Sequence, residues 1–247
     1  MGVYRKLVAI IGMTVMGVTT FLIRYISFGY GIPLNQKIIA PFFARVILFF
    51  QGVSVEVNIN HLSENQTYCY FFNHNSFLDL FLVPLIKLKN TRFIISEVVK
   101  QVIPLHLCNL GVNVLYIPDS DKTEERIEFF KQVSKDLSED KYSVICSPEG
   151  RHAFIKGISP FNKGVFHMAL ASGKPIHNLF FDIKADKSPD NIASIKSGKI
   201  KISTMNIIQT SDWKIDEVEE YIASTYKLFL ERYREAHGDY GDSKVEA

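Results

Sequence analysis

The first fifty residues constrain the fold most, because they contain two long apolar runs. Residues 7–23 form a run of seventeen residues without a charge, which is just long enough to cross the hydrocarbon core of a bilayer. Residues 38–50 form a second apolar run of thirteen residues, interrupted by Pro41 and Arg45. This second run is short for a membrane span and is typical of an interfacial or re-entrant helix.

Basic residues flank both runs, at Arg5, Lys6, Lys37 and Arg45. Because cytoplasmic flanks are enriched in Lys and Arg, this pattern predicts a hairpin with both ends on the cytoplasmic side. A cleaved signal peptide is the alternative, but Ser-Phe-Gly at 27–29 is a poor cleavage site and the second run stays unexplained. We therefore expect residues 1–51 to be a membrane-associated helical hairpin.

The remaining chain alternates between strand and helix patterns. Strands are expected at 53–59, 68–72, 91–95, 112–117, 142–146, 176–183 and 200–208. Helices are expected at 77–88, 96–102, 122–137 and 164–172, and an apolar stripe predicts a final helix at 215–233. Pro104 is expected to stop the helix at 96–102. The order predicts an α/β domain at 52–237, with a mixed, mostly parallel sheet flanked by helices. Residues 238–247 look like a disordered tail.

Composition excludes several classes of function. The net charge of +2 is too small to indicate nucleic-acid binding. Cys69, Cys108 and Cys146 have no zinc-site spacing and are expected to be buried free thiols, and no metal-ligand cluster is apparent. The sequence has neither a Gly-x-Ser-x-Gly nucleophile motif nor a glycine-rich phosphate-binding motif.

A polar loop interrupts two apolar patterns at residues 73–76. We interpret it as the loop between a buried strand and a helix, with His74 in the loop and Ser76 as the N-cap. On one continuous helix His74 and Asp79 would point about 140° apart, so the loop is what allows them to meet. A carboxylate on one imidazole nitrogen leaves the other nitrogen to act as a base. Alternatively, Asp79 only caps its helix and His74 only fills a loop.

A second charged loop, Ser-Pro-Glu-Gly-Arg-His at 147–152, follows the strand expected at 142–146. Pro148 and Gly150 shape a tight turn, and Arg151 offers a planar fork for a phosphate. Glu149 is expected to orient Arg151 or to accept from a substrate hydroxyl. Lys163 opens the next helix, whose N-terminus also favours anions. Taken alone this is an ordinary surface turn with a salt bridge, but parallel strands would bring it to the edge of the sheet that holds His74.

Four blocks in order resemble the glycerolipid acyltransferase family, whose best-known members are the lysophosphatidic acid acyltransferases. Residues 73–79 match its Asn-His-x4-Asp block, and residues 148–151 resemble its Pro-Glu-Gly-Thr/Ser-Arg block with Arg directly after Gly. Residues 161–170 resemble its Phe-Lys-x-Gly stretch, and residues 174–178 its Val-Pro-Ile-x-Pro block. The resemblance covers residues 52–182 and also implies a membrane-seated N-terminal hairpin.

The resemblance implies a membrane-associated O-acyltransferase with its catalytic domain on the cytoplasmic side. His74 is expected to be the general base and Asp79 the residue that orients it. Glu149, Gly150 and Arg151, with Asn73 and Lys163, are expected to bind the acceptor. No cofactor or metal is expected; acyl-CoA or acyl carrier protein would be the thioester co-substrate, and a membrane lysolipid the acceptor, with lysophosphatidic acid favoured.

Two departures from the family pattern bear on the acceptor. Glu97 is retained, but the lysine that the family often places two residues earlier is absent. Residues 116–119 read Tyr-Ile-Pro-Asp where the family often has an Ile-Asp-Arg-like run, and the next arginine is Arg126. Because of these departures, another acceptor, such as lyso-ornithine lipid, remains an alternative to lysophosphatidic acid. A thioesterase-like hydrolase and a non-catalytic lipid-binding protein are further alternatives.

Overall fold

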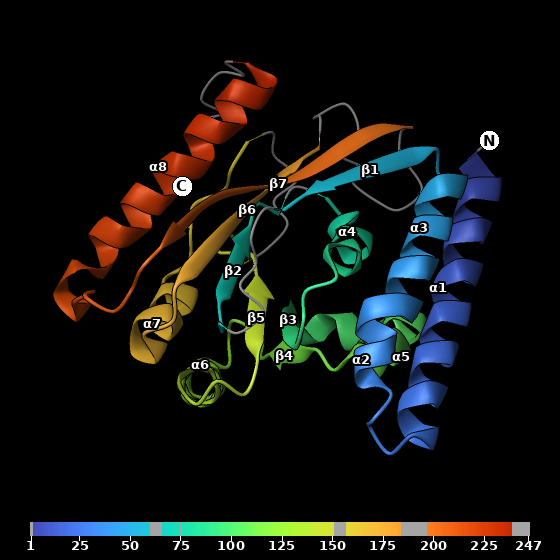
Figure 1. Cartoon of the computed structure of the whole chain (residues 1–247), viewed down its shortest axis with the longest axis horizontal. Helices are drawn as coiled ribbons and strands as arrows, with labels where there is room; N and C mark the ends of the chain where they lie inside the picture. Colours follow the sequence, from blue (N-terminus) through green and yellow to red (C-terminus); the bar gives the residue numbers. More distant parts are fainter. Residues whose placement is uncertain (1, 60–65, 75, 151–156, 184–196, 239–247) are drawn as a thin grey trace.

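The computed structural model describes residues 2–59, 66–74, 76–150, 157–183 and 197–238. Among these residues seven strands form one sheet in the order β1-β7-β6-β2-β5-β3-β4 (Figure 1). Every neighbouring pair is parallel except β6 and β7, so β1 and β7 run opposite to the other five strands. The predicted mixed, mostly parallel sheet is confirmed.

The strands lie close to the predicted ranges. Their bounds are β1 Val53–Asn58, β2 Cys69–Phe72, β3 Thr91–Ser96, β4 Leu115–Ile117, β5 Ser143–Cys146, β6 Ile176–Asp182 and β7 Gly198–Ile208. β2 lies at the centre of the sheet, with β6 on one side and β5 on the other.

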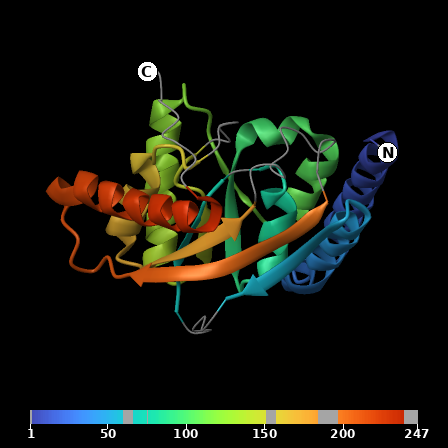
Figure 2. The same ribbon diagram turned by 90° about the horizontal axis from the view of Figure 1, so that it is seen from above.

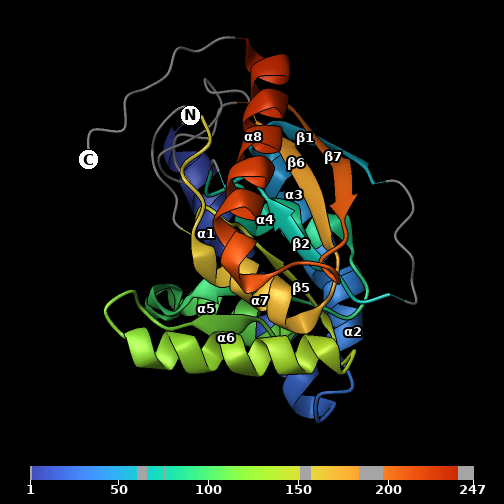
Figure 3. The ribbon, with the colours of Figure 1, turned by 90° about the vertical axis from the view of Figure 1, so that its left-hand side faces the viewer.

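Helices cover both faces of the sheet. On one face are α4 (Asp79–Ile86), α5 (Ile103–Val112) and the N-terminal hairpin, and on the other are α6 (Thr123–Ser138), α7 (Lys163–Ser172) and α8 (Val218–His237). Figure 2 shows the hairpin and α8 at opposite ends of the molecule, and Figure 3 looks onto α6, α7 and α8. A short 3₁₀ turn, η3 (Ile215–Glu217), precedes α8.

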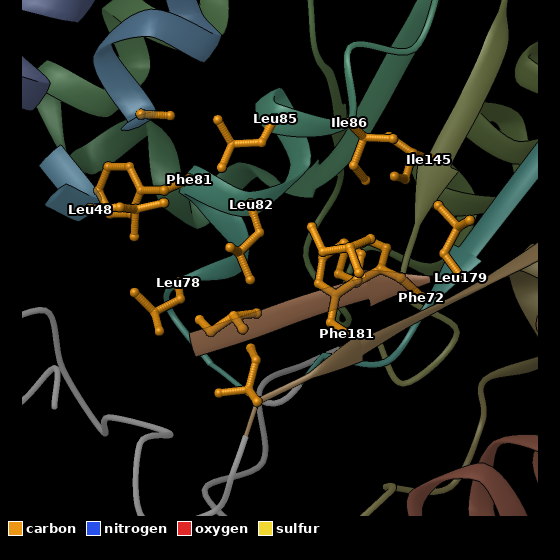
Figure 4. Close-up of a cluster of buried hydrophobic side chains, with 14 of the residues drawn as sticks. Leu48, Phe72, Leu78, Phe81, Leu82, Leu85, Ile86, Ile145, Leu179 and Phe181 are labelled. Carbon is orange, nitrogen blue, oxygen red and sulfur yellow. The ribbon is translucent and has the colours of Figure 1, made fainter. Parts of the chain in front are cut away.

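Side chains of β2 alternate between two buried clusters. Tyr70 and Phe72 face the cluster beneath α4, while Cys69 and Phe71 face the cluster beneath α6, α7 and α8. Phe72 stacks on Phe181 of β6, with ring centroids 4.8 Å apart (Figure 4). Since both faces are covered, the central strands read as continuous apolar runs rather than as an alternation of apolar and polar residues.

The sequence prediction was wrong around Pro104. Pro104 was expected to stop a helix, but it lies in the first turn of α5, where its missing N–H costs no hydrogen bond. Residues 96–102 form only a short 3₁₀ helix, η2 (Glu97–Gln101). The strand expected at 112–117 shrinks to β4, because α5 continues to Val112 and ends at Asn113 in a left-handed conformation.

Two further helix boundaries differ from the prediction. α4 begins at Asp79 and ends at Ile86, rather than spanning 77–88. Ser76 is not the residue before α4, but its hydroxyl still accepts the N–H of Leu78 at 3.1 Å. Residues 239–247 of the expected tail lie outside the described residues.

The N-terminal hairpin consists of α1 (Gly2–Ile26) and a second helical arm. This arm runs without a break through α2 (Ile32–Leu34), the π-helical η1 (Asn35–Ile39) and α3 (Ala40–Phe50). The arm is longer than the expected 38–50, because Pro33 starts a helix instead of ending the connection. By length and composition alone, Tyr4–Ile26 and Ile32–Phe50 are each apolar enough to cross a membrane.

Close packing and buried amides dock the hairpin on the rest of the fold. A Cβ at Gly17 of α1 would lie 2.4 Å from the carbonyl oxygen of Pro104, so only glycine permits this approach of α1 to α5. The buried Asn35 donates to the carbonyls of Thr20 and Gly111, at 2.7 and 3.0 Å. The hairpin is therefore packed against α5 over an extended contact.

Replacing Gly17 by alanine tests this contact. The substitution raises helix propensity by about 1 kcal/mol, yet the added methyl clashes with backbone of α5. Overpacking typically costs about 1–3 kcal/mol, so we expect the free energy of unfolding to fall despite the propensity gain. Denaturant titration in detergent micelles measures the free energy of unfolding, and Val18→Ala, at an exposed neighbouring position, is the control. Equal stability of Gly17→Ala and wild type would contradict the close contact.

Candidate active site

His74 and Asp79 meet as the sequence predicted. His74 lies in the loop after β2 and Asp79 is the first residue of α4; the His74 Nδ1 to Asp79 Oδ2 distance is 2.6 Å. The Asp79 side chain is buried, and that of His74 is 26% exposed. The bond to Asp79 fixes the ring tautomer, so Nε2 is the nitrogen that would act as a base.

The surroundings of His74 favour its charged form. Burial lowers the pKa of His74, but the hydrogen bond and charge of Asp79, with the charge of Glu149, outweigh it and raise the pKa above its usual 6.5. A buried carboxylate on a partly exposed imidazole is an arrangement suited to taking a proton and holding the resulting charge.

Glu149 connects the two predicted loops. β2 and β5 are adjacent and parallel, so the loops that follow them meet at one edge of the sheet. Glu149 Oε1 accepts the backbone N–H of His74 at 2.7 Å, and Oε2 accepts that of Ser159 at 2.8 Å. Burial raises the pKa of the Glu149 carboxyl to about 7, although these two N–H groups oppose the rise. Both carboxylate oxygens of Glu149 are thus engaged with backbone N–H groups. The expected contact with Arg151 lies outside the described residues.

Gly150 forms the tight turn that was expected. Its φ is +70°, and a Cβ there would lie 2.4 Å from Nδ2 of Asn162. Asn162 Nδ2 donates to the carbonyl of Glu149 at 2.7 Å, and this bond fastens the turn to the start of α7. Sequence reasoning missed Asn162 and Ser159 as supports of the site. An asparagine directly before a helix indicates an N-cap, yet here its side chain makes no capping bond.

Asn73 holds the loop to the other neighbour of β2. It is fully buried; its Oδ1 accepts the N–H of Phe181 at 2.7 Å and its Nδ2 donates to the carbonyl of Phe181 at 3.0 Å. In this arrangement the amide is engaged with β6, not with the surface where an acceptor would bind. Asn73 therefore has a structural contact that the sequence did not reveal.

The two predicted cations have different outcomes. Lys163 is exposed at the start of α7 and forms an ion pair with Glu219 of α8. Arg151 falls within 151–156, outside the described residues. Over the ranges that the structure describes, no three His, Cys, Asp or Glu side chains gather as a metal site, and the three cysteines are buried and free.

Glu97 lies at the same edge of the sheet, directly after β3. Its carboxylate accepts from Lys122 at 2.6 Å, from Lys100 at 3.3 Å and from the N–H of Asp119 at 3.2 Å. The hydrogen bond from Lys122, with those from Asp119 and Lys100, lowers the pKa of Glu97 to about 2. Both lysines are thus paired with the Glu97 carboxylate.

Comparison with known proteins identifies relatives of this chain. The 1-acyl-sn-glycerol-3-phosphate acyltransferase of Haemophilus influenzae is 25% identical over 236 residues, which cover 94% of this chain and 94% of that protein. The Cocos nucifera protein of the same name is 23% identical over 198 residues, or 78% of this chain. This chain spans 62% of the length of the Cocos nucifera relative.

A solved structure shares the fold. The crystal structure of the 1-acyl-sn-glycerophosphate (LPA) acyltransferase from Thermotoga maritima matches with a TM-score of 0.67 at 16% identity, and the match covers 95% of this chain and 98% of that one. The model of the family described as Acyltransferase matches residues 54–181, which is more than half of the chain and includes both loops of the site. The protein therefore belongs to the acyltransferase family.

Proposed function

We propose that this protein transfers an acyl chain from a thioester to the hydroxyl of a lysophospholipid, with lysophosphatidic acid as the favoured acceptor and phosphatidic acid as the product. The observation that carries the proposal is the 2.6 Å contact between His74 and Asp79 at the edge where the two loops meet. Membership of the acyltransferase family and the names of the relatives also support acyl transfer.

The proposed reaction needs one base. Nε2 of His74 takes the proton of the acceptor hydroxyl, and the oxygen attacks the thioester carbonyl of acyl-CoA or acyl carrier protein. The carbon–sulfur bond then breaks, and the leaving thiolate takes the proton back from His74. Asp79 stabilises the imidazolium between these two proton transfers. No covalent acyl-enzyme is formed and no cofactor is needed.

The supporting residues are assigned by their contacts. Glu149 and Asn73 are positioning residues, because their polar atoms bind the backbone of His74, Ser159 and Phe181. We assign the acceptor head group to Gly150 and Arg151, with Lys163 adding positive charge. A lysolipid without a phosphate monoester, such as lyso-ornithine lipid, is the second candidate acceptor. Pro118 lies where the family often has an Ile-Asp-Arg-like run, and Arg126, the next arginine in the sequence, donates to the Pro118 carbonyl.

An apolar cavity along α4 is the proposed site of the acyl chain. It lies between the hairpin, α4, α5 and β3 and is partly open to solvent. Its lining includes Ala40, Leu80, Pro84, Phe93, Leu105 and Cys108. Leu80 follows Asp79 directly in α4, so the cavity extends to the first turn of the helix that carries this carboxylate.

The hairpin supplies the proposed membrane attachment. Over the most apolar stretch of each candidate span, only 28% and 33% of the residues are buried. Gln36 of the second arm donates to the carbonyls of Thr91 and Val112, at 3.2 and 2.8 Å, so the hairpin is tied to the α/β domain. We therefore propose that the hairpin lies in the cytoplasmic leaflet with the catalytic domain on the cytoplasmic side, rather than crossing the bilayer alone.

Purified protein with labelled acyl-CoA, acyl carrier protein and a panel of lysolipids tests the proposed function. We expect acylation of lysophosphatidic acid, and a loss of about 10²–10⁴-fold in kcat for His74→Ala, the usual worth of a general base. His167→Ala, an exposed histidine on α7, is the matched control. Near-normal turnover by His74→Ala would contradict the mechanism. Release of free fatty acid without lysolipid would indicate a hydrolase, and inactivity with every pair a non-catalytic protein.

The pH dependence tests the role of Asp79. Only neutral His74 acts as a base, so kcat/KM is expected to rise with pH through a His74 pKa above 6.5. Asp79→Asn removes the charge that raises this pKa, so the acidic limb of the profile moves to lower pH while kcat falls. Circular dichroism checks that the variant is folded. An unshifted limb would show that Asp79 does not act on His74.

Filling the cavity tests the acyl-chain site. Ala40→Leu adds three carbons at a buried lining position. At about 0.8 kcal/mol per methylene, displacing two methylenes of the donor lowers kcat/KM for long-chain donors by about tenfold. Shorter donors are expected to be affected less. Ala171→Leu, on the exposed side of α7, is the control. An equal effect on all chain lengths would place the acyl chain elsewhere.

A further inference from the structure

Exposed apolar side chains gather at the corner where β3 leads into α5, away from the hairpin loop. Val98 in η2 is 50% exposed, Val102 is 48% exposed, and Ile103 at the start of α5 is 70% exposed. We call these three residues the apolar corner. Three large apolar side chains exposed within six residues form a patch rather than the scattered exposure that is common on soluble proteins.

The apolar corner borders the exposed face of α1. Pro104, which follows Ile103, packs against Gly17 of α1. Thr14 lies one helical turn before Gly17 and Ile10 lies two turns before it, so both are on the side of α1 that faces the start of α5. Both residues are exposed. The exposed faces of the hairpin and of the apolar corner therefore adjoin.

Charge identifies the partner that this surface fits. Residues 1–51 contain five of the 28 Lys and Arg residues and none of the 26 Asp and Glu residues, which leaves 23 basic and 26 acidic residues in the rest of the chain. Lys100, between Val98 and Val102, is exposed. Lys100 pairs with Glu97, so the net positive charge lies on the hairpin. An apolar corner next to a hairpin that carries basic and no acidic residues matches an anionic bilayer surface.

We propose that the apolar corner is a third bilayer contact, beside the two arms of the hairpin, and that it lays the catalytic edge of the sheet against the membrane surface. η2 begins directly after the last residue of β3, Ser96. β3 is parallel to β5 and β5 to β2, so the corner and His74 lie at the same edge of the sheet. A lysolipid embedded in the bilayer would then reach His74 with its acyl chain still in the membrane. This inference rests on the membrane association in the proposed function.

A fluorescent label at position 103 tests the contact in the full-length protein. Ile103→Cys is labelled with an environment-sensitive dye; the native cysteines are buried, and wild-type protein taken through the same reaction gives the background. The protein is reconstituted into vesicles of phosphatidylethanolamine and phosphatidylglycerol, with or without lipids carrying a nitroxide on the acyl chain. Val15→Cys on α1 is the hairpin reference. Ile127→Cys, 63% exposed on α6 across the sheet, is the matched control.

We expect the labels at 103 and 15 to shift to the blue and to be quenched several-fold more than the label at 127. Quenching at 15 with a response at 103 equal to that at 127 would overturn the third contact and leave the hairpin and the acyl-transfer proposal standing. A blue shift at 103 without lipid quenching would also overturn it, because a protein would then cover the corner. Absence of quenching at both 103 and 15 would overturn the membrane association itself.

Activity gives a second, independent measurement. In the double variant Val102→Ser, Ile103→Ser, acylation of a lysolipid held in vesicles is expected to fall several-fold. Acylation of a short-chain, water-soluble lysolipid is expected to stay unchanged, because neither residue belongs to the catalytic site. An equal loss with both acceptors would contradict the proposal. The quenching measurement does not require turnover, so it decides the inference even where the acyl-transfer proposal fails.

Discussion

The short hydrogen bond between His74 and Asp79 depends on how the loop after β2 is fixed. β2 lies between β6 and β5, and consecutive loop residues bind to each side. Asn73 binds the backbone of Phe181 in β6, and the N–H of His74 binds Glu149 after β5. With the backbone held on both sides, the imidazole lies 2.6 Å from the first carboxylate of α4. The position of the His74 ring is thus set by buried contacts to the sheet rather than by the loop alone.

The hairpin belongs to the same packed structure. Gly17 lets α1 approach α5, and the side-chain amides of Asn35 and Gln36 bind carbonyls of α1, α5 and β3. The apolar cavity is lined from both the hairpin and the α/β domain, so its shape depends on their contact. The proposed membrane attachment, the proposed acyl-chain site and the proposed catalytic edge therefore depend on one arrangement of α1, α4 and α5.

The sequence predicted the features that depend on residue spacing. Apolar periodicity located the strands within one or two residues in most cases, and the break between loop and helix placed His74 beside Asp79. α5 was missed because Pro104 was interpreted as a helix stop, although proline is also common in the first turn of a helix. Which reading applies depends on the contact of α5 with α1, which is not visible in local sequence.

The supports of the site were harder to predict. Glu149 and Asn73 look like surface residues ready to bind a substrate, because their type is polar and they follow strands. Glu149 binds the backbone of His74, and Asn73 binds that of Phe181, both more than seventy positions away, and only the strand order brings these groups together. The family resemblance indicated which residues matter without indicating which of them face the substrate.

The most direct test of the central claim is nitrogen NMR of His74 across a pH titration, assigned with His74→Gln. The measurement reports the tautomer and pKa of this one ring, which separates it from Glu149, whose pKa of about 7 lies in the same range. The account predicts a proton on Nδ1, an unprotonated Nε2 at high pH and a pKa above 6.5 that falls in Asp79→Asn. A proton on Nε2 at high pH, or a pKa unaffected by Asp79, would contradict it.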